Sequence, residues 1–178
     1  MSQEADRHLV LVGLMGSGKT TVGTACAARL HRPFVDTDEV VEATTGQTVA
    51  EIFATAGEGT FRDLERRAIA DVCDSPAPLV IACGGGAVLD AENRGRLRAS
   101  GVVIWLRAAP AVLAARVRHE ASTRPLLRSG NPEQQLERLA EVRADAYESA
   151  AHATVDTDAR DVEQVVDAIL EELAQCGV

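Results

Sequence analysis

Eight residues near the start of the chain have the types and spacing of a phosphate-binding loop. Residues 13–20 read Gly-Leu-Met-Gly-Ser-Gly-Lys-Thr, which fits the pattern of a glycine, four residues and then Gly-Lys-Ser/Thr. The glycines let successive backbone N–H groups turn towards one concavity that suits phosphate oxygens. Lys19 can reach the β- and γ-phosphates of a nucleotide, and the Thr20 hydroxyl can ligate Mg²⁺. The pattern therefore predicts a nucleotide site rather than an ordinary glycine-rich turn.

The segments on either side of this loop are those that the motif requires. Residues 8–12 form an apolar run typical of a buried strand, and residues 21–30 carry apolar side chains on one helical face. A helix that begins near Gly18 adds the positive end of its dipole to the phosphate site. Lys19 is the only lysine in a chain that otherwise uses arginine, which suggests a chemical requirement at this position. The residues predicted to bind the nucleotide here are Gly13, Met15, Gly16, Ser17, Gly18, Lys19, Thr20 and Thr21.

Two aspartates, Asp36 and Asp38, directly follow a predicted second strand at residues 32–35. Ligands of parallel α/β sheets bind beyond the carboxyl ends of the strands, so both aspartates should lie on the same edge as the phosphate loop. One can serve Mg²⁺, directly or through water, and the other a substrate hydroxyl. Either can instead cap the acidic helix that follows, and one residue can do both.

Two later stretches are candidates for contacts with a second substrate. Arg62 and Glu65 are spaced on a predicted helix, residues 61–72, so that Glu65 can orient Arg62. Taken alone, an arginine is more often a solvated surface charge. A run of three glycines, residues 84–86, follows the predicted third strand, residues 78–83. Such a run costs more chain entropy than a tight turn requires, so we expect its backbone to approach a ligand.

Strands and helices alternate along the rest of the chain, which predicts an α/β fold with a parallel sheet. Residues 57–59, Gly-Glu-Gly, are expected to interrupt the helical pattern, and residues 120–132 have no regular pattern. A segment of that length inside a compact domain predicts a mobile lid, here carrying Arg124 and Arg128. The further strands are expected at residues 101–106 and 153–155, and the further helices at 48–56, 92–99, 110–119, 133–149 and 162–173.

Length and composition limit the class of protein. The 178 residues suit one domain with a small lid, and 46% hydrophobic residues are enough for a packed core. A formal net charge of −9 argues against a nucleic-acid surface. Four widely spaced cysteines without a Cys-x-x-Cys pair predict neither a disulfide framework nor a metal cluster. With no signal peptide or membrane span expected, the sequence predicts a cytoplasmic protein. We also expect a monomer, although no sequence feature reports the oligomeric state.

In combination, these motifs closely resemble the shikimate kinases, in the family's order and spacing. The motifs are residues 13–20, Asp-Thr-Asp (36–38), Phe-Arg-Asp-Leu-Glu (61–65), Gly-Gly-Gly (84–86), Arg-Pro-Leu-Leu (124–127) and Arg143 with Tyr147. The resemblance implies a P-loop kinase of the nucleoside-monophosphate-kinase fold, a single domain over residues 1–178 with a lid at 120–132. It implies three α/β/α layers around a five-stranded parallel sheet of order 2-3-1-4-5. It also implies transfer of the γ-phosphate of ATP to the 3-hydroxyl of shikimate, a step of aromatic amino-acid synthesis.

The resemblance also implies roles for single residues at the acceptor. Asp36 corresponds to the aspartate that serves Mg²⁺, and Asp38 to the one that contacts substrate hydroxyls. Arg62 and Arg143 correspond to the arginines that hold the substrate carboxylate, for which a guanidinium fork is the natural partner. Asp38 can orient or deprotonate the attacking hydroxyl, and the sequence leaves both open. The glycines implied at the substrate are Gly84, Gly85 and Gly86.

At the nucleotide, the resemblance implies three arginines besides Lys19. Arg124, in the lid, would reach the phosphates, and Lys19 and Arg124 would neutralise the group in transfer. Arg118 and Arg160 would contact the adenine, with Arg116 as a rival to Arg118. Two other functions stay open at this point. One is a kinase of another small hydroxylated acid, such as gluconate. The other is a protein that binds ATP without transferring phosphate, which would not need Arg62, Arg143 or the glycine run.

Overall fold

The computed structural model describes residues 7–117 and 131–177 and has one parallel β-sheet with helices on both faces. The strand order is β2-β3-β1-β4-β5, and the pairs between neighbours are all parallel. The α/β class and the order 2-3-1-4-5 are therefore confirmed. The strands are β1 (His8–Val12), β2 (Phe34–Asp36), β3 (Val80–Ala82), β4 (Gly101–Arg107) and β5 (Ala153–Asp156).

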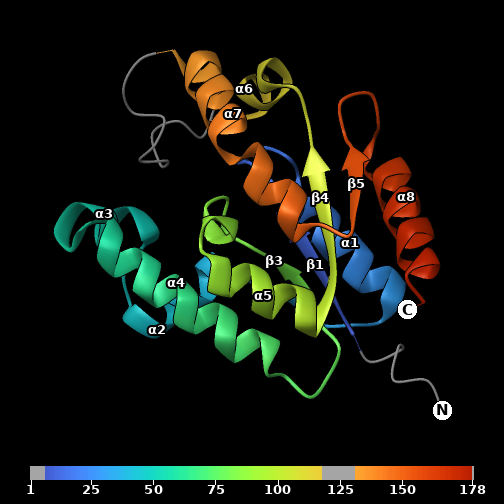
Figure 1. Ribbon diagram of the computed structural model, residues 1–178, viewed down its shortest axis with the longest axis horizontal. Helices are drawn as coiled ribbons and strands as arrows, with labels where there is room; N and C mark the ends of the chain where they lie inside the picture. Colours follow the sequence, from blue (N-terminus) through green and yellow to red (C-terminus); the bar gives the residue numbers. More distant parts are fainter. Residues whose placement is uncertain (1–6, 118–130, 178) are drawn as a thin grey trace.

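Helices connect the strands and follow the last one (Figure 1). In the order of the described chain, α2, α3 and α4 come after β2 and before β3, and α6 and α7 come after β4 and before β5. The helices are α1 (Lys19–Leu30), α2 (Thr37–Thr45), α3 (Val49–Thr55), α4 (Gly57–Cys73), the 3₁₀ helix η2 (Ala87–Leu89), α5 (Ala91–Ser100), α6 (Pro110–Val117), α7 (Pro132–Ala150) and α8 (Val162–Gln175).

The inner strands β1 and β3 are buried on both faces, as expected of a sheet covered by helices on each side. Alternate residues of β1 point to opposite faces. Leu9 and Leu11 pack with apolar residues of α1 and α8. Val10 and Val12 pack with apolar residues of α4, α5, α6 and α7. The central strand is thus enclosed, and its carboxyl end carries the phosphate loop between the two helical layers.

A smaller apolar cluster holds α2, α3 and α4 together at the edge of the molecule (Figure 1). Val41, Ile52 and Phe61 are its buried centre. Thr48 and Glu51 begin α3 with a capping box: Glu51 N donates to Thr48 Oγ1 at 3.2 Å, and Thr48 N donates to Glu51 Oε2 at 2.7 Å. The three-residue spacing of Thr48 and Glu51 in the sequence is the pattern that forms this cap.

Several predicted element boundaries differ from the structure. The second strand spans Phe34–Asp36 rather than 32–35, so Asp36 is its last residue. The break predicted at residues 57–59 is present but shorter and earlier: α3 ends at Thr55, and α4 begins at Gly57 directly after the single residue Ala56, so Glu58 and Gly59 are helical. Only Gly57 has a positive φ, +83°, so the change of direction is confined to one residue. The third strand is shorter than the predicted 78–83, because the N–H of Leu79 donates to His8 Nδ1 at 3.0 Å.

The predicted lid at residues 120–132 lies outside the described residues, apart from Asn131 and Pro132. Asn131 caps α7, its side chain accepting from Glu133 N at 2.9 Å, and Pro132 is the first helical residue. Proline suits that position because its missing N–H would have no partner there. Within the described residues, we find no helix that combines the length and apolarity needed to cross a membrane.

Candidate active site

The phosphate loop joins β1 to α1 in a conformation that its glycines make possible. Gly16 and Gly18 have φ of +80° and +95°, in the region that favours glycine. A Cβ on Gly13 would lie 2.4 Å from the carbonyl oxygen of Leu106, so β4 also requires glycine there. Lys19 Nζ donates to the carbonyl oxygens of Gly13 at 2.8 Å and Leu14 at 3.1 Å. The ammonium group is thereby held over the concavity of the loop.

A hydroxyl and a carboxylate meet beside this loop. Thr20 Oγ1 donates to Asp36 Oδ2 at 3.2 Å, which links the start of α1 to the end of β2. The other oxygen of Asp36 caps α2 by accepting from Asp38 N at 3.0 Å. Asp36 therefore caps a helix and also faces the phosphate loop. The Thr20 hydroxyl and the Asp36 carboxylate thus place two oxygen atoms side by side, and oxygen is the hard ligand that Mg²⁺ prefers.

Asp38 lies in the first turn of α2 and faces Glu65 of α4 across Gly84. Asp38 Oδ1 and Glu65 Oε1 are buried, and neither has a hydrogen-bond partner among the described residues. Burial raises the pKa of Asp38 to about 6, and the nearby charges of Asp36 and Glu65 act in the same direction. Burial also raises the pKa of Glu65, against the lowering effect of Arg62. These two oxygens are acceptors placed for hydroxyl groups of a ligand.

Glu65 orients Arg62, as the sequence predicts. Arg62 Nη1 forms an ion pair with Glu65 Oε2 at 2.8 Å, and Arg62 Nη2 pairs with Glu58 Oε1 at 3.0 Å. Glu65 is buried, whereas the Glu58 side chain is 58% exposed. The Arg62 guanidinium is thus fixed on its buried side by Glu65 and on its solvent side by Glu58.

Glycine is required in the run after β3 because neighbouring side chains occupy the space of a Cβ, and not because the backbone conformation is unusual. None of the three glycines has a positive φ. A Cβ on Gly84 would lie 2.7 Å from Glu65 Oε1 and 2.8 Å from Asp38 Oδ1. A Cβ on Gly86 would lie 2.5 Å from both terminal nitrogens of Arg62. The sequence argument, which invoked chain entropy and a ligand, did not foresee this requirement for space.

Two residues that the sequence argument gave no role fix this run. Thr37 is fully buried, and its hydroxyl accepts from Gly84 N at 3.1 Å. The hydroxyl of Tyr147 donates to the carbonyl oxygen of Gly85 at 2.5 Å. Arg143 Nη1 donates to the same oxygen at 2.9 Å. The four-residue spacing of Arg143 and Tyr147 on α7 is the signal that could have identified the pair.

The phosphate loop, the aspartates, the arginines and the glycine run border one cavity of about 590 Å³. That volume is typical of a small-molecule site. The predicted site residues that line it are Met15, Gly16, Gly18, Lys19, Thr20, Thr21, Asp36, Asp38, Arg62, Gly84, Gly85, Gly86 and Arg143. Gly13 and Ser17 belong to the loop without lining the cavity.

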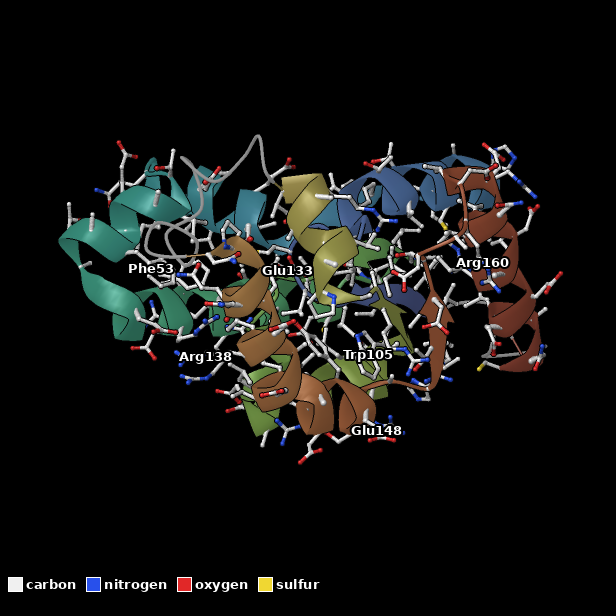
Figure 2. The ribbon with its side chains drawn as sticks, turned by 90° about the horizontal axis from the view of Figure 1, so that it is seen from above. Phe53, Trp105, Glu133, Arg138, Glu148 and Arg160 are labelled. Carbon is white, nitrogen blue, oxygen red and sulfur yellow. The ribbon has the colours of Figure 1, made fainter. Side chains whose placement is uncertain are left out.

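The arginines predicted at the nucleotide are only partly described. Arg118 and Arg124 lie outside the described residues. Arg160 is exposed on the loop between β5 and α8 and does not line the cavity. Figure 2 shows it at the opposite end of the molecule from Phe53, which lines the acceptor side. Arg116 does line the cavity and donates to the carbonyl oxygens of Gly16, at 3.3 Å, and Thr157, at 2.8 Å.

Comparisons with known proteins agree with this geometry. A family model described as shikimate kinase matches residues 15–174. The shikimate kinase of Symbiobacterium thermophilum is 50% identical, over 96% of this chain and 98% of that protein. The shikimate kinase of Burkholderia thailandensis is 43% identical, over 99% and 96% respectively.

A solved structure gives the same result. The shikimate kinase of Acinetobacter baumannii in complex with shikimate superposes with a TM-score of 0.92 at 37% identity. The match covers 97% of this chain and 95% of that one. Since the family model and these relatives match the chain almost from end to end, the chain belongs to the shikimate kinase family.

Proposed function

We propose that this protein transfers the γ-phosphate of ATP to the 3-hydroxyl of shikimate, giving shikimate 3-phosphate and ADP. The observation that carries the proposal is the single cavity that joins a phosphate loop to two arginines and a buried aspartate. A phosphate loop alone serves many nucleotide enzymes. The opposite wall offers cationic groups for a carboxylate and orphaned carboxylate oxygens for hydroxyls, which suits a small hydroxylated acid.

On the acceptor side, we assign Arg62 and Arg143 to the substrate carboxylate. Arg143 is 5% exposed, and the ion pairs of the described residues do not include it. Its described hydrogen bond goes to the neutral carbonyl oxygen of Gly85, and it interacts with Glu65 electrostatically without a direct ion pair, so an anion in the cavity would be a favourable partner. Asp38 is assigned to the reacting hydroxyl, whose proton it accepts as the oxygen attacks the γ-phosphorus. Gly84, Gly85 and Gly86 form the wall between these groups.

On the nucleotide side, the loop N–H groups and Lys19 are assigned to the phosphates. Thr20 and Asp36 would hold Mg²⁺, which their oxygen donors fit. Mg²⁺ held by these two residues would supply positive charge that neutralises the nucleotide phosphates. Arg124 is assigned to the transferring phosphate, with Arg118 or Arg116, and Arg160, at the adenine. We further propose a monomeric cytoplasmic enzyme that needs no nucleic acid, membrane or protein partner.

A coupled assay of ADP release tests the proposal. We expect release to require ATP, Mg²⁺ and shikimate together, and to be near background with gluconate in place of shikimate. Equal release with gluconate would favour a kinase of another hydroxylated acid. Tight ATP binding without release under any of these conditions would favour a nucleotide-binding protein that does not transfer phosphate.

A further inference from the structure

Tyr147 lies directly behind the acceptor wall. The residue is buried, and its hydroxyl donates to the carbonyl oxygen of Gly85 at 2.5 Å. Arg143, one turn earlier on α7, donates to the same oxygen at 2.9 Å. Arg143 and Gly85 line the acceptor cavity, whereas Tyr147 is not among its lining residues. We infer that Tyr147 is a positioning residue, which fixes Arg143 and the Gly85 peptide for the substrate carboxylate.

The glycine run needs an external anchor, because it carries no side chains to restrain its backbone. Glycine has the largest conformational freedom of any residue, and three in succession are the least restrained peptide units in the site. Thr37 holds the Gly84 N–H. The Gly85 carbonyl is held only from α7 among the described contacts, by Arg143 and Tyr147 together. Without the hydroxyl, this peptide and the guanidinium would each gain alternative orientations.

Ring packing alone does not determine where the hydroxyl points. The Tyr147 ring stacks on Trp105 with centroids 5.4 Å apart and an interplanar angle of 18° (Trp105 is labelled in Figure 2). Both rings also border a second cavity, of about 470 Å³, lined largely by apolar side chains. Packing encloses the ring, which is 1% exposed, but apolar contacts hold a phenylalanine ring equally well, so the hydroxyl adds a directional contact to Gly85 that packing does not supply.

The inference rests on the proposed function, so wild-type binding is measured first. Titration calorimetry without nucleotide should show that shikimate binds. Absence of binding overturns the proposed function and this inference with it. Tyr147→Phe should then weaken shikimate binding about 3- to 10-fold, the range expected for one hydrogen bond. ATP affinity and kcat should change by less than twofold. Unchanged shikimate affinity in Tyr147→Phe overturns the inference and leaves the proposed function intact.

A double-mutant cycle tests whether the effect passes through Arg143. In an Arg143→Ala background, Tyr147→Phe should cost little further affinity for shikimate, because the group that it positions is gone. Full additivity of the two losses overturns the inference. Trp105→Phe is the matched packing control. It reduces the ring stack but leaves the hydroxyl, so it should lower Tm without weakening shikimate binding. An equal loss of affinity in this control overturns the inference as well.

A measurement that keeps the hydroxyl covers the case in which Tyr147→Phe fails to fold. Tyr147 is the only tyrosine in the chain, so biosynthetic 3-fluorotyrosine gives one ¹⁹F resonance. Shikimate should shift this resonance when its carboxylate draws on Arg143. Shikimate methyl ester at saturating concentration should shift it much less. A resonance that does not respond to shikimate contradicts the inference.

Discussion

Asp38 is the residue whose surroundings most affect the proposed chemistry. Its carboxyl group lies near three other acidic side chains, those of Asp36, Glu65 and Glu42, and Lys19 offsets them only in part. Burial is the largest cause of its raised pKa, about 6, and these charges add to it. A carboxylate with a pKa nearer neutrality is a better proton acceptor for a hydroxyl than an ordinary aspartate.

The pH dependence of the reaction follows from this pKa. Only the ionised form of Asp38 can accept a proton, so kcat/KM for shikimate should fall about tenfold per pH unit below about 6. Steady-state rates between pH 5 and 8 measure this. Asp38→Asn should be slower on the order of 10²-fold and should lose the inflection. Glu65→Gln, which removes a neighbouring negative charge, should move the inflection to lower pH. An unchanged inflection in Asp38→Asn would assign the titration to another group.

Helix α4 carries a carboxylate, that of Glu58, which would compete with the substrate carboxylate for Arg62. Glu58 binds Arg62 through both Nε, at 3.3 Å, and Nη2, at 3.0 Å, from the solvent side. A substrate carboxylate that reaches Arg62 has to displace this contact, whereas the buried partner Glu65 can stay. Exposed pairs one helical turn apart are weak, about 0.3–0.5 kcal/mol. The arrangement therefore predicts a small cost to substrate binding.

Glu58→Gln should lower the KM for shikimate about twofold, because Arg62 is then released from a weak competitor. The KM for ATP should not change. Glu92→Gln on α5 is a matched control, since it breaks a similar exposed pair, with Arg96 at 3.1 Å, away from the cavity. Steady-state kinetics at low ionic strength measure both. A raised KM for shikimate in Glu58→Gln would mean that Glu58 supports the site rather than competing for it.

The sequence predicts elements well where the signal is local. The capping box of α3 and the helix after the phosphate loop depend on residues within one or two turns. The third strand and the glycine run differ from the prediction because distant residues decide them. His8 takes the N–H of Leu79 from 71 positions away. Asp38 and Glu65 reach Gly84 from other elements, and no local pattern records those contacts.

For the whole molecule, two histidines link stability to pH. His8 Nδ1 accepts from Leu79 N at 3.0 Å, and His152 Nδ1 accepts from Val103 N at 3.0 Å. A nitrogen that accepts a backbone N–H cannot also carry a proton. Burial is the main cause that lowers the pKa of both histidines below the usual 6.5. The unfolded chain therefore binds protons more readily, and their contribution to stability is lost as the pH falls below about 6.5.

Urea unfolding at pH 7.5 and 5.5 tests this for His8→Gln, whose amide oxygen can accept from Leu79 N without titrating. The wild type should lose free energy of unfolding relative to the variant as the pH falls. The wild type and the variant have to be compared because Asp38, with its raised pKa, takes up a proton on folding and therefore makes both proteins more stable as the pH falls. A constant difference for His8→Gln would contradict the assignment.

The position of the site could be predicted from the sequence because parallel strands end at one edge. The phosphate loop and the glycine run follow strands, and Asp36 is the last residue of β2, so they meet at that edge. Arg143 and Tyr147 come from the second half of a long helix, and only the family resemblance pointed to this pair. The hydrogen bond between Tyr147 and Gly85 joins residues 62 positions apart, and no local sequence pattern near either residue predicts it.

Because the only lysine of the chain lies in the phosphate loop, the protein has an unusual reactivity towards amine reagents. The chain has one lysine, so a reagent that acylates side-chain amines has a single target of that kind, at the centre of the nucleotide site. Its ammonium is engaged by the carbonyl oxygens of Gly13 and Leu14. Labelling, cross-linking or immobilisation through lysine would therefore act as inhibition, and the stoichiometry of acylation would count nucleotide sites.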